Sequence, residues 1–194
     1  MLKARVKLEI KVWVLCFMSK TTFLVLGGCK SGKSSYALNL ANGMSKEARK
    51  VFIATSVPAD SEMEERVLAH QKERGPDWLS LEEPLDIAEV IKDHSRLADV
   101  ILVDCLTLWV SNLLYKGFDK KEIITRYVEE LISSVEDAEC SVIMVSNEVG
   151  FGIVPENKLA RLFRDIAGIT NQEIAKSVSR VVFTMAGIPV NIKG

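Results

Sequence analysis

One octapeptide, directly after the apolar run 22–26, constrains this chain more than any other feature. Its residues are Gly27, Gly28, Cys29, Lys30, Ser31, Gly32, Lys33 and Ser34. It matches the phosphate-loop pattern G-x-x-x-x-G-K-S/T, in which backbone N–H groups turn toward phosphate oxygens, the lysine reaches the β- and γ-phosphates and the serine binds Mg²⁺. The alternative is a chance match in a glycine turn, but a strand before and a helix after the loop are both predicted here. We therefore expect residues 27–34 to bind a nucleotide, with Lys33 catalytic.

Composition favours a small-molecule partner. The 194 residues carry 25 basic and 26 acidic side chains, so nothing attracts nucleic acid or an anionic membrane in general. The four cysteines, Cys16, Cys29, Cys105 and Cys140, form no C-x-x-C pair and indicate neither a zinc site nor a disulfide framework. We expect reduced thiols and a cytoplasmic protein.

The first twenty residues combine basic positions with the apolar run 12–18 and superficially resemble a signal peptide. They lack a small-residue cleavage site, and the run is far too short to span a membrane. We expect residues 1–20 to be a non-essential extension, with Met18 a plausible start, and residues 21–194 to form a single domain.

Apolar runs alternate with helical periodicity along the rest of the chain. The sequence predicts strands at 22–26, 51–54, 99–104, 141–146, 181–185 and 188–192, and a brief extended segment at 78–81. It predicts helices at 33–44, 60–74, 84–94 (with Pro84 at its start), 106–115, 119–135 and 156–179 (with a disturbance at Gly168). This order favours an α/β three-layer fold of the P-loop NTPase type, with a mainly parallel sheet and a C-terminal hairpin around Gly187.

Acidic and polar residues stand at the carboxyl ends of predicted strands, where open α/β sheets bind ligands. Asp104 follows a buried strand and fits the second Mg²⁺ ligand beside Ser34. It could also cap the helix that begins at Leu106, and the two roles are compatible. Thr55 and Ser56 end another strand, which should place them beside the phosphate loop.

The chain has two histidines, His70 and His94. His94 reads as an ordinary residue of a charged helix. Lys72 and Arg74 follow His70, so an anionic ligand could be held there while a neutral imidazole attacks phosphorus. The same two cations could equally form a solvated helix face.

The loop 147–155 follows a buried strand, again on the ligand side of the sheet. Asn147 and Glu148 could contact a ligand there. A polar strand-to-helix turn is the structural alternative, and spacing alone does not choose between them.

Together these motifs resemble the bifunctional adenosylcobinamide kinase/adenosylcobinamide-phosphate guanylyltransferase family of cobalamin biosynthesis. The resemblance runs from about Phe23 to Lys193 and is most specific in the context of His70 and in the segment 147–172. It implies phosphorylation of the aminopropanol hydroxyl of adenosylcobinamide by GTP or ATP. GTP then donates GMP to that phosphate through a histidine-GMP intermediate, giving adenosyl-GDP-cobinamide and pyrophosphate, and the position that matches the histidine is His70.

The resemblance also implies a homotrimer with active sites between subunits. Implied nucleotide contacts beyond the loop 27–34 are Thr55, Ser56, Val57, Gln71, Lys72, Glu73, Arg74, Glu82 and Asp104. Some relatives carry a second histidine where this chain has Ala69, and glutamate where it has Asp104. Two other hypotheses remain: a monofunctional small-molecule P-loop kinase in which His70 only binds phosphate, and a nucleotide-dependent switch protein.

Overall fold

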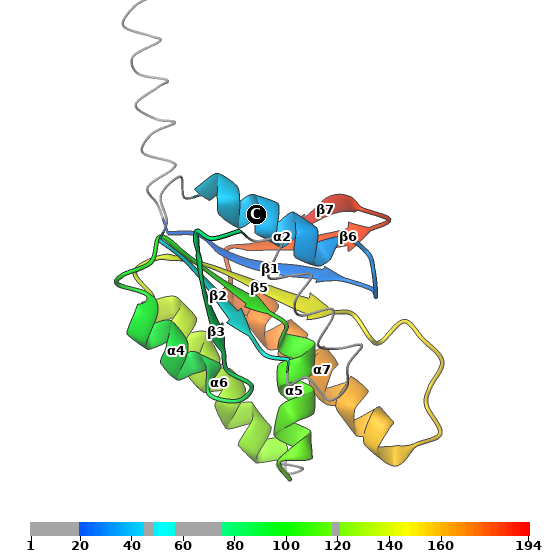
Figure 1. Ribbon diagram of the computed structural model, residues 1–194. Helices are drawn as coiled ribbons and strands as arrows, with labels where there is room; N and C mark the ends of the chain where they lie inside the picture. The colour runs from blue at the N-terminus through cyan, green and yellow to red at the C-terminus, as the bar shows by residue number, and fades with distance from the viewer. Residues whose placement is uncertain (1–19, 45–48, 57–74, 118–120) are drawn as a thin grey trace, which may run out of the picture.

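The computed structural model describes residues 20–44, 49–56, 75–117 and 121–194, and its elements are shown in Figure 1. The strands are β1 (Thr22–Gly27), β2 (Lys50–Ala54), β3 (Trp78–Glu82), β4 (Val100–Asp104), β5 (Ser141–Asn147), β6 (Arg180–Met185) and β7 (Ile188–Lys193). The helices are α2 (Lys33–Met44), α4 (Ile87–His94), α5 (Leu106–Tyr115), α6 (Lys121–Asp137) and α7 (Lys158–Ser177). The helix predicted at 60–74 lies outside the described residues.

All of these strands form one seven-stranded sheet in the order β3-β2-β4-β5-β1-β6-β7. Every neighbouring pair is parallel except β6 and β7, which form an antiparallel hairpin. Its two-residue turn, Ala186-Gly187, has φ values of +51° and +80°, as a type I′ turn requires. The predicted α/β layers, mainly parallel sheet and closing hairpin are confirmed.

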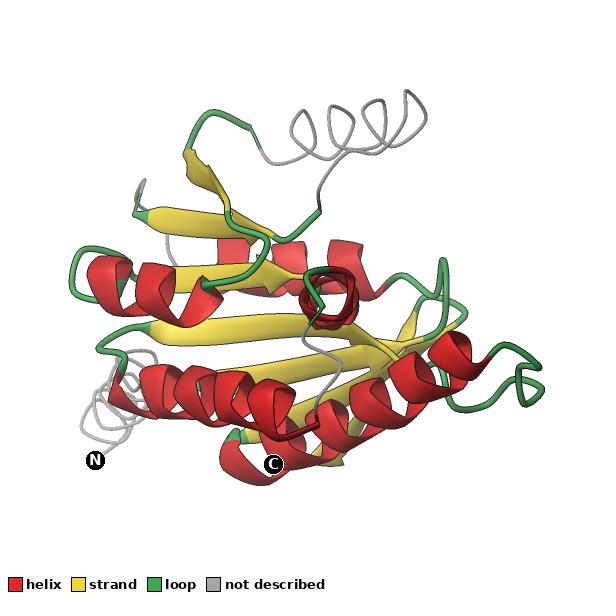
Figure 2. Cartoon of the chain, turned by 90° about the horizontal axis from the view of Figure 1, so that it is seen from below, coloured by secondary structure: helices red, strands yellow, loops and turns green. Residues whose placement is uncertain are grey.

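Helices cover both faces of the sheet. Figures 1 and 2 show α2 on one face and α4, α5, α6 and α7 on the other. Alternate residues of each strand point to opposite faces, so Val100 and Leu102 of β4 pack with α2, whereas Ile101 and Val103 join the larger helical cluster. The buried apolar residues of α2, Ala37 and Ala41, are small, which lets this helix lie close to the sheet. The phosphate-loop helix is thereby fixed to the central strands.

The starts of α4 and α7 differ from their predicted positions for local reasons, and α6 spans Lys121–Asp137 where 119–135 was predicted. Glu83 Oε1 accepts hydrogen bonds from the backbone N–H groups of Leu85 and Asp86, at 2.8 and 2.9 Å. These bonds hold a turn, so α4 begins at Ile87 and the prediction of Pro84 at the helix start is wrong. At α7 the side chain of Asn157 accepts from Ala160 N and caps the helix, which therefore begins at Lys158 and not at residue 156.

No disturbance appears at Gly168, because α7 is continuous from Lys158 to Ser177. A glycine costs a helix interior about 1 kcal/mol relative to alanine. Burial of Ile166 and Ile174 in the core cluster that α7 shares with the sheet outweighs that cost. Gly117, in contrast, does end a helical segment as predicted, with a φ of +83° just after α5.

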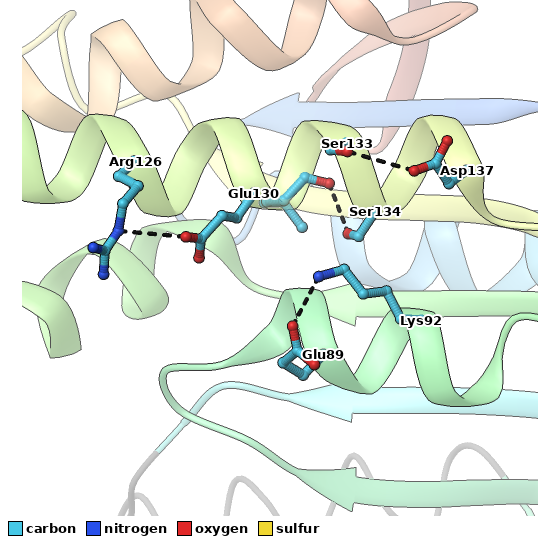
Figure 3. Close-up of polar contacts among 8 residues, drawn as sticks. Glu89, Lys92, Arg126, Glu130, Ser133, Ser134 and Asp137 are labelled. Atoms are coloured by element: carbon cyan, nitrogen blue, oxygen red, sulfur yellow. Dashed lines mark hydrogen bonds and ion pairs between the residues drawn. The ribbon is translucent and has the colours of Figure 1, made fainter.

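The exposed sides of α4 and α6 carry local ion pairs, shown in Figure 3. Lys92 contacts Glu89 at 2.8 Å, and Arg126 contacts Glu130 at 3.3 Å. The hydrogen bond that Lys92 Nζ donates to the Glu89 carboxylate raises the pKa of Lys92. Exposed pairs of this kind contribute little to stability, so we read this surface as a solvated helix face. Among the helices of the described part of the chain, none is long and apolar enough to cross a membrane.

Candidate active site

The phosphate loop connects β1 to α2 (Figure 1). Lys30 and Gly32 have φ values of +52° and +93°, and Ser31 N donates to Gly28 O at 3.3 Å. The first bond of α2 runs from Tyr36 N to Gly32 O at 2.9 Å. Left-handed residues next to a helix N-terminus turn backbone N–H groups into one concave surface, which is suited to phosphate. The predicted loop geometry is therefore present.

Lys33 is folded back over this loop. Its side chain is buried, and Nζ donates to Gly28 O at 3.1 Å. An ammonium group has three protons to donate, so this contact leaves Nζ able to bind phosphate oxygens as well. Lys33 Nζ thus lies at the phosphate loop, and its catalytic role stays a prediction.

The C-terminal β6–β7 hairpin is hydrogen-bonded to the phosphate loop and to the end of β1. Ser31 Oγ lies 2.8 Å from Thr184 Oγ1, and Thr184 Oγ1 donates to Leu26 O at 3.1 Å. Gly187 N donates to Ser31 O at 2.9 Å. A Cβ on Gly27 would lie 2.3 Å from Ser31 Oγ, so only glycine fits there. The sequence reading did not find Thr184 or Gly187, because a residue that acts from a distant strand leaves no local motif.

Asp104 ends β4 at the same edge of the sheet. The N-cap position of α5 is Cys105, so Asp104 is not the N-cap residue that one interpretation proposed. Burial is the main cause that raises the pKa of the Cys105 thiol to about 11; the Asp104 carboxylate adds to this rise and the Lys33 ammonium opposes it.

The oxygen ligands expected for Mg²⁺ are available in this region. Ser34 is half-buried in the first turn of α2, and Asp104 is half-buried at the end of β4. The described residues contain no cluster of three or more histidine, cysteine or acidic side chains that could hold a metal. Mg²⁺ normally takes one or two protein ligands and completes its shell with phosphate oxygens and water, so this donor set fits Mg²⁺.

Thr55 and Ser56 lie at the same edge but not beside the loop. The strand order places β4 and β5 between β2 and β1, a separation of about 14 Å at the usual strand spacing. The expectation that they adjoin the loop is wrong, because a single hydrophobic run does not encode its neighbours in the sheet. Thr55 is fully buried, and its hydroxyl donates to Cys105 O at 2.7 Å and accepts from Cys105 N at 2.8 Å.

Glu82 ends β3 and is exposed. It lies four strand positions from β1, about 19 Å along the edge. A bound nucleotide would have to extend along the edge to reach it. The remaining predicted contacts, Val57, His70, Gln71, Lys72, Glu73 and Arg74, lie outside the described residues.

The loop 147–155 begins inside the site. Asn147 pairs in register with Gly27, and Glu148 N donates to Gly27 O at 3.1 Å. Asn147 N donates to Thr107 Oγ1 at 2.6 Å, which ties the strand end to α5. Farther along, the ring of Phe151 lies 6.1 Å from that of Phe183 on β6. The start of this loop therefore lies next to the phosphate loop.

A separate hollow of about 290 Å³ lies between α6 and α7, on the face opposite α2. Its lining is mostly aliphatic, with Ile124, Val128, Ile132, Ile166 and Ile169. It does not reach the carboxyl edge of the sheet where the phosphate loop, Asp104 and Asn147 meet. We therefore place the active site at that edge.

Comparison with known proteins agrees with this site. Residues 23–192 match the family model described as cobinamide kinase / cobinamide phosphate guanyltransferase. The bifunctional adenosylcobalamin biosynthesis protein CobP of Pseudomonas aeruginosa (strain PAO1) is 39% identical, with 88% of this chain and 96% of that protein covered. The bifunctional adenosylcobalamin biosynthesis protein CobU of Escherichia coli (strain K12) is 38% identical, with 88% and 98% covered.

The crystal structure of the flagellar accessory protein FlaH from Methanocaldococcus jannaschii superposes with a TM-score of 0.52. Its identity is 14%, over 89% of this chain and 78% of that one, so the likeness shows the fold alone. The phosphate loop 27–34 between β1 and α2 of a mainly parallel sheet makes this fold one of the P-loop NTPase type. The chain belongs to the cobinamide kinase / cobinamide phosphate guanyltransferase family and is a kinase and guanylyltransferase of cobalamin biosynthesis.

Proposed function

We propose that one nucleotide site, built on the phosphate loop, serves two successive reactions. The first transfers the γ-phosphoryl group of GTP or ATP to the aminopropanol hydroxyl of adenosylcobinamide. The second transfers GMP from GTP to that phosphate and releases pyrophosphate. The observation that carries the proposal is the meeting of the phosphate loop, buried Lys33 and Asp104 at one edge of the sheet.

In the kinase step the chain's contribution is positioning and charge. The loop amides and Lys33 hold the β- and γ-phosphates and stabilise the negative charge that develops between them. We infer that Ser34 and Asp104 hold Mg²⁺, which when bound would neutralise part of that charge. Lys33 already lies over the loop, so the site is organised before the nucleotide arrives.

In the guanylyl step we infer that a nitrogen of neutral His70 attacks the α-phosphorus of GTP. An N–P bond forms, the bond from the α-phosphorus to its bridging oxygen breaks, and pyrophosphate leaves with that electron pair. A phosphate oxygen of adenosylcobinamide phosphate then displaces the histidine. Two in-line displacements replace one difficult transfer. The support is the match of His70 to the family's nucleophile, since His70 lies outside the described residues.

The test is incubation with Mg²⁺ and GTP labelled at the α-phosphorus, followed by denaturation and peptide mapping. We expect label on the peptide that contains His70, stable to alkali and lost in acid. His70→Ala should abolish this label and spare cobinamide phosphorylation, whereas Lys33→Ala should impair both activities. His94→Ala is the matched control, because His94 Nδ1 is engaged with Val90 O at 2.9 Å within α4.

The outcomes separate the rival hypotheses. A kinase without guanylyl transfer would give phosphorylated cobinamide but no protein-bound label. A nucleotide switch would bind GTP without turnover of cobinamide. Loss of both activities in a folded His70→Ala protein that still binds GTP would contradict the division of roles proposed here.

We further propose that the enzyme is a cytoplasmic homotrimer. The three cysteines of the described residues are free thiols, which agrees with a reducing compartment. Large apolar side chains are exposed on the hairpin and in the loop after β5, among them Phe151, Ile153, Met185, Ile188 and Ile192. Exposed apolar surface of this kind is typical of subunit contacts. Sedimentation equilibrium should give three times the mass of one chain, and a monomer with full activity would contradict the proposal.

A further inference from the structure

Two buried side-chain oxygens in the part of the chain that the structure describes have no hydrogen-bond partner. They are Asn147 Oδ1 and Asn171 Oδ1. Leaving a buried acceptor unpaired costs about 1–3 kcal/mol, and buried polar groups in folded proteins are paired in the large majority of cases. An acceptor that is buried and unpaired at a ligand-binding edge therefore points to a donor that arrives with the ligand.

The backbone of Asn147 is held firmly around this unpaired atom. Asn147 N donates to Thr107 Oγ1 at 2.6 Å, and Asn147 O accepts from Asn171 Nδ2 at 3.1 Å. Asn171 comes from α7 and is 5% exposed. Elements from both sides thus fix the position of Asn147, while its side-chain oxygen stays unpaired.

The sheet places Asn147 where the transferred phosphoryl group must lie. Strand β5 runs between β1, which carries the phosphate loop, and β4, which ends at Asp104. Asn147 pairs with Gly27, and Val145 pairs with Asp104. Alternation along β5 puts Asn147 on the side of Val145, which packs in the cluster beneath α2. The amide is therefore on the phosphate-loop face, between the loop and Asp104.

The groups expected in the site limit which hydrogen-bond donor can reach Asn147 Oδ1. Phosphate oxygens are acceptors and cannot pair with Asn147 Oδ1. Lys33 Nζ donates to Gly28 O, and its remaining protons are assigned above to the β- and γ-phosphates. The donor that must stand within about 3–3.5 Å of the γ-phosphorus is the attacking hydroxyl. Resting on the kinase activity set out above, we propose that Asn147 Oδ1 accepts a hydrogen bond from the substrate hydroxyl and orients it for attack. Asn171 is a positioning residue that acts through Asn147.

The step balances without a further reactant. A lone pair of the hydroxyl oxygen forms the bond to the γ-phosphorus, and the bond from the γ-phosphorus to the β–γ bridging oxygen breaks, leaving its electron pair on the nucleoside diphosphate. The hydroxyl proton points at Asn147 Oδ1 before the reaction. An amide oxygen is too weak a base to keep it, so the proton passes to a transferred phosphate oxygen and then to solvent.

The test uses Asn147→Ala and the apolar near-isostere Asn147→Leu, with Asn39→Ala as the matched control on an exposed position of α2. Three quantities are measured: phosphorylation of adenosylcobinamide, guanylyl transfer to adenosylcobinamide phosphate supplied ready-made, and the Kd for GTP. We expect kinase kcat/KM to fall about 10- to 100-fold in both Asn147 variants. The other two quantities should stay within about threefold of wild type, because neither involves the hydroxyl.

The thermal unfolding temperature distinguishes a catalytic role of Asn147 from a purely structural one. Replacing an unpaired buried acceptor by an apolar group of similar shape is neutral or stabilising, so Asn147→Leu should unfold at or above the wild-type temperature. Unchanged kinase activity, equal loss of both reactions, or unfolding below wild type in both variants would overturn the inference. If the wild-type chain itself fails to phosphorylate adenosylcobinamide, the proposed kinase function fails first and this inference falls with it.

Discussion

Ser31 and Thr184 join the phosphate loop to a strand more than 150 residues later, with 2.8 Å between their hydroxyl oxygens. Thr184 donates its single hydroxyl proton to Leu26 O, at 3.1 Å. The hydroxyl of Ser31 must therefore donate to Thr184 Oγ1. One threonine therefore fixes both the last residues of β1 and the middle of the loop. The C-terminal hairpin is part of the nucleotide site although it contains no phosphate-binding motif.

We expect Thr184→Val to weaken this junction. Valine has nearly the same shape and suits a strand, but it removes the two hydrogen bonds that the Thr184 hydroxyl makes with Leu26 O and Ser31 Oγ. The free energy of unfolding should fall by about 1–3 kcal/mol and GTP affinity should fall with it, as measured by urea titration and calorimetry. Thr125→Val, on an exposed turn of α6, is the control. Wild-type affinity in Thr184→Val would show that the hairpin does not shape the loop.

Gly32→Ala should distort the loop directly. Gly32 has a φ of +93°, and a Cβ there would lie 3.1 Å from Gly187 Cα. Both effects force the loop away from the hairpin, so we expect GTP binding to fall at least tenfold. In Gly43→Ala the added methyl meets nothing within 4 Å, and it should stabilise α2 by about 0.5–1 kcal/mol. Equal nucleotide affinity in both variants would rule out this geometry.

Cys29 should be the thiol that reagents reach first among the described cysteines. It is exposed in the phosphate loop, whereas Cys105 and Cys140 are buried. Burial raises the pKa of both buried thiols to about 11, so they carry almost no reactive thiolate near pH 8.

The experiment treats a Cys16→Ser protein with N-ethylmaleimide and maps the modified peptides over time. GTP should slow labelling of Cys29 because it covers the loop, and Cys29→Ser should leave almost no rapid labelling. Labelling of Cys105 at the rate of Cys29 would contradict the buried position of Cys105 before α5.

Stability should decline at alkaline pH because of the same two buried thiols. Each has a folded-state pKa of about 11, above the ordinary value of 9.0. Above pH 9 the unfolded chain loses these protons first, so the stabilisation is complete below pH 9 and is lost as the pH rises toward 11. The loss should be on the order of 1–3 kcal/mol per thiol. Urea titrations from pH 8 to 10.5 should show a shallower decline in Cys105→Ser; an unchanged slope would refute the assignment.

A chain that begins at Met18 should keep both activities. The family match begins at residue 23, and the truncation retains Lys20, whose Nζ donates to Glu136 O at the end of α6. Kinase and guanylyl transfer rates within about twofold of the full chain, with an unchanged unfolding midpoint, are expected. A large loss in either rate would show that residues 1–17 contribute to the site.

Local patterns predicted most elements with bounds within one to three residues. Helix α5 spans the predicted residues, from Leu106 to Tyr115. Both of its ends depend on residues nearby in the sequence: it begins just after a buried strand and ends just before Gly117. The start of α4 was predicted wrongly, because the turn before it depends on the Glu83 side chain. Local rules favour proline at a helix start but do not reveal a side chain that competes for the same backbone groups.

By itself the sequence determined the phosphate loop, the buried strands, the alternating α/β order and the family, because each depends on residues close together in the chain. Tertiary structure decided which strand ends meet. It placed Asn147 between the phosphate loop and Asp104, separated Thr55 from the loop by two strands, and set Thr184 and Gly187 behind Ser31. Strand order follows from the packing of side chains on both faces of the sheet, and no short stretch of sequence encodes that balance.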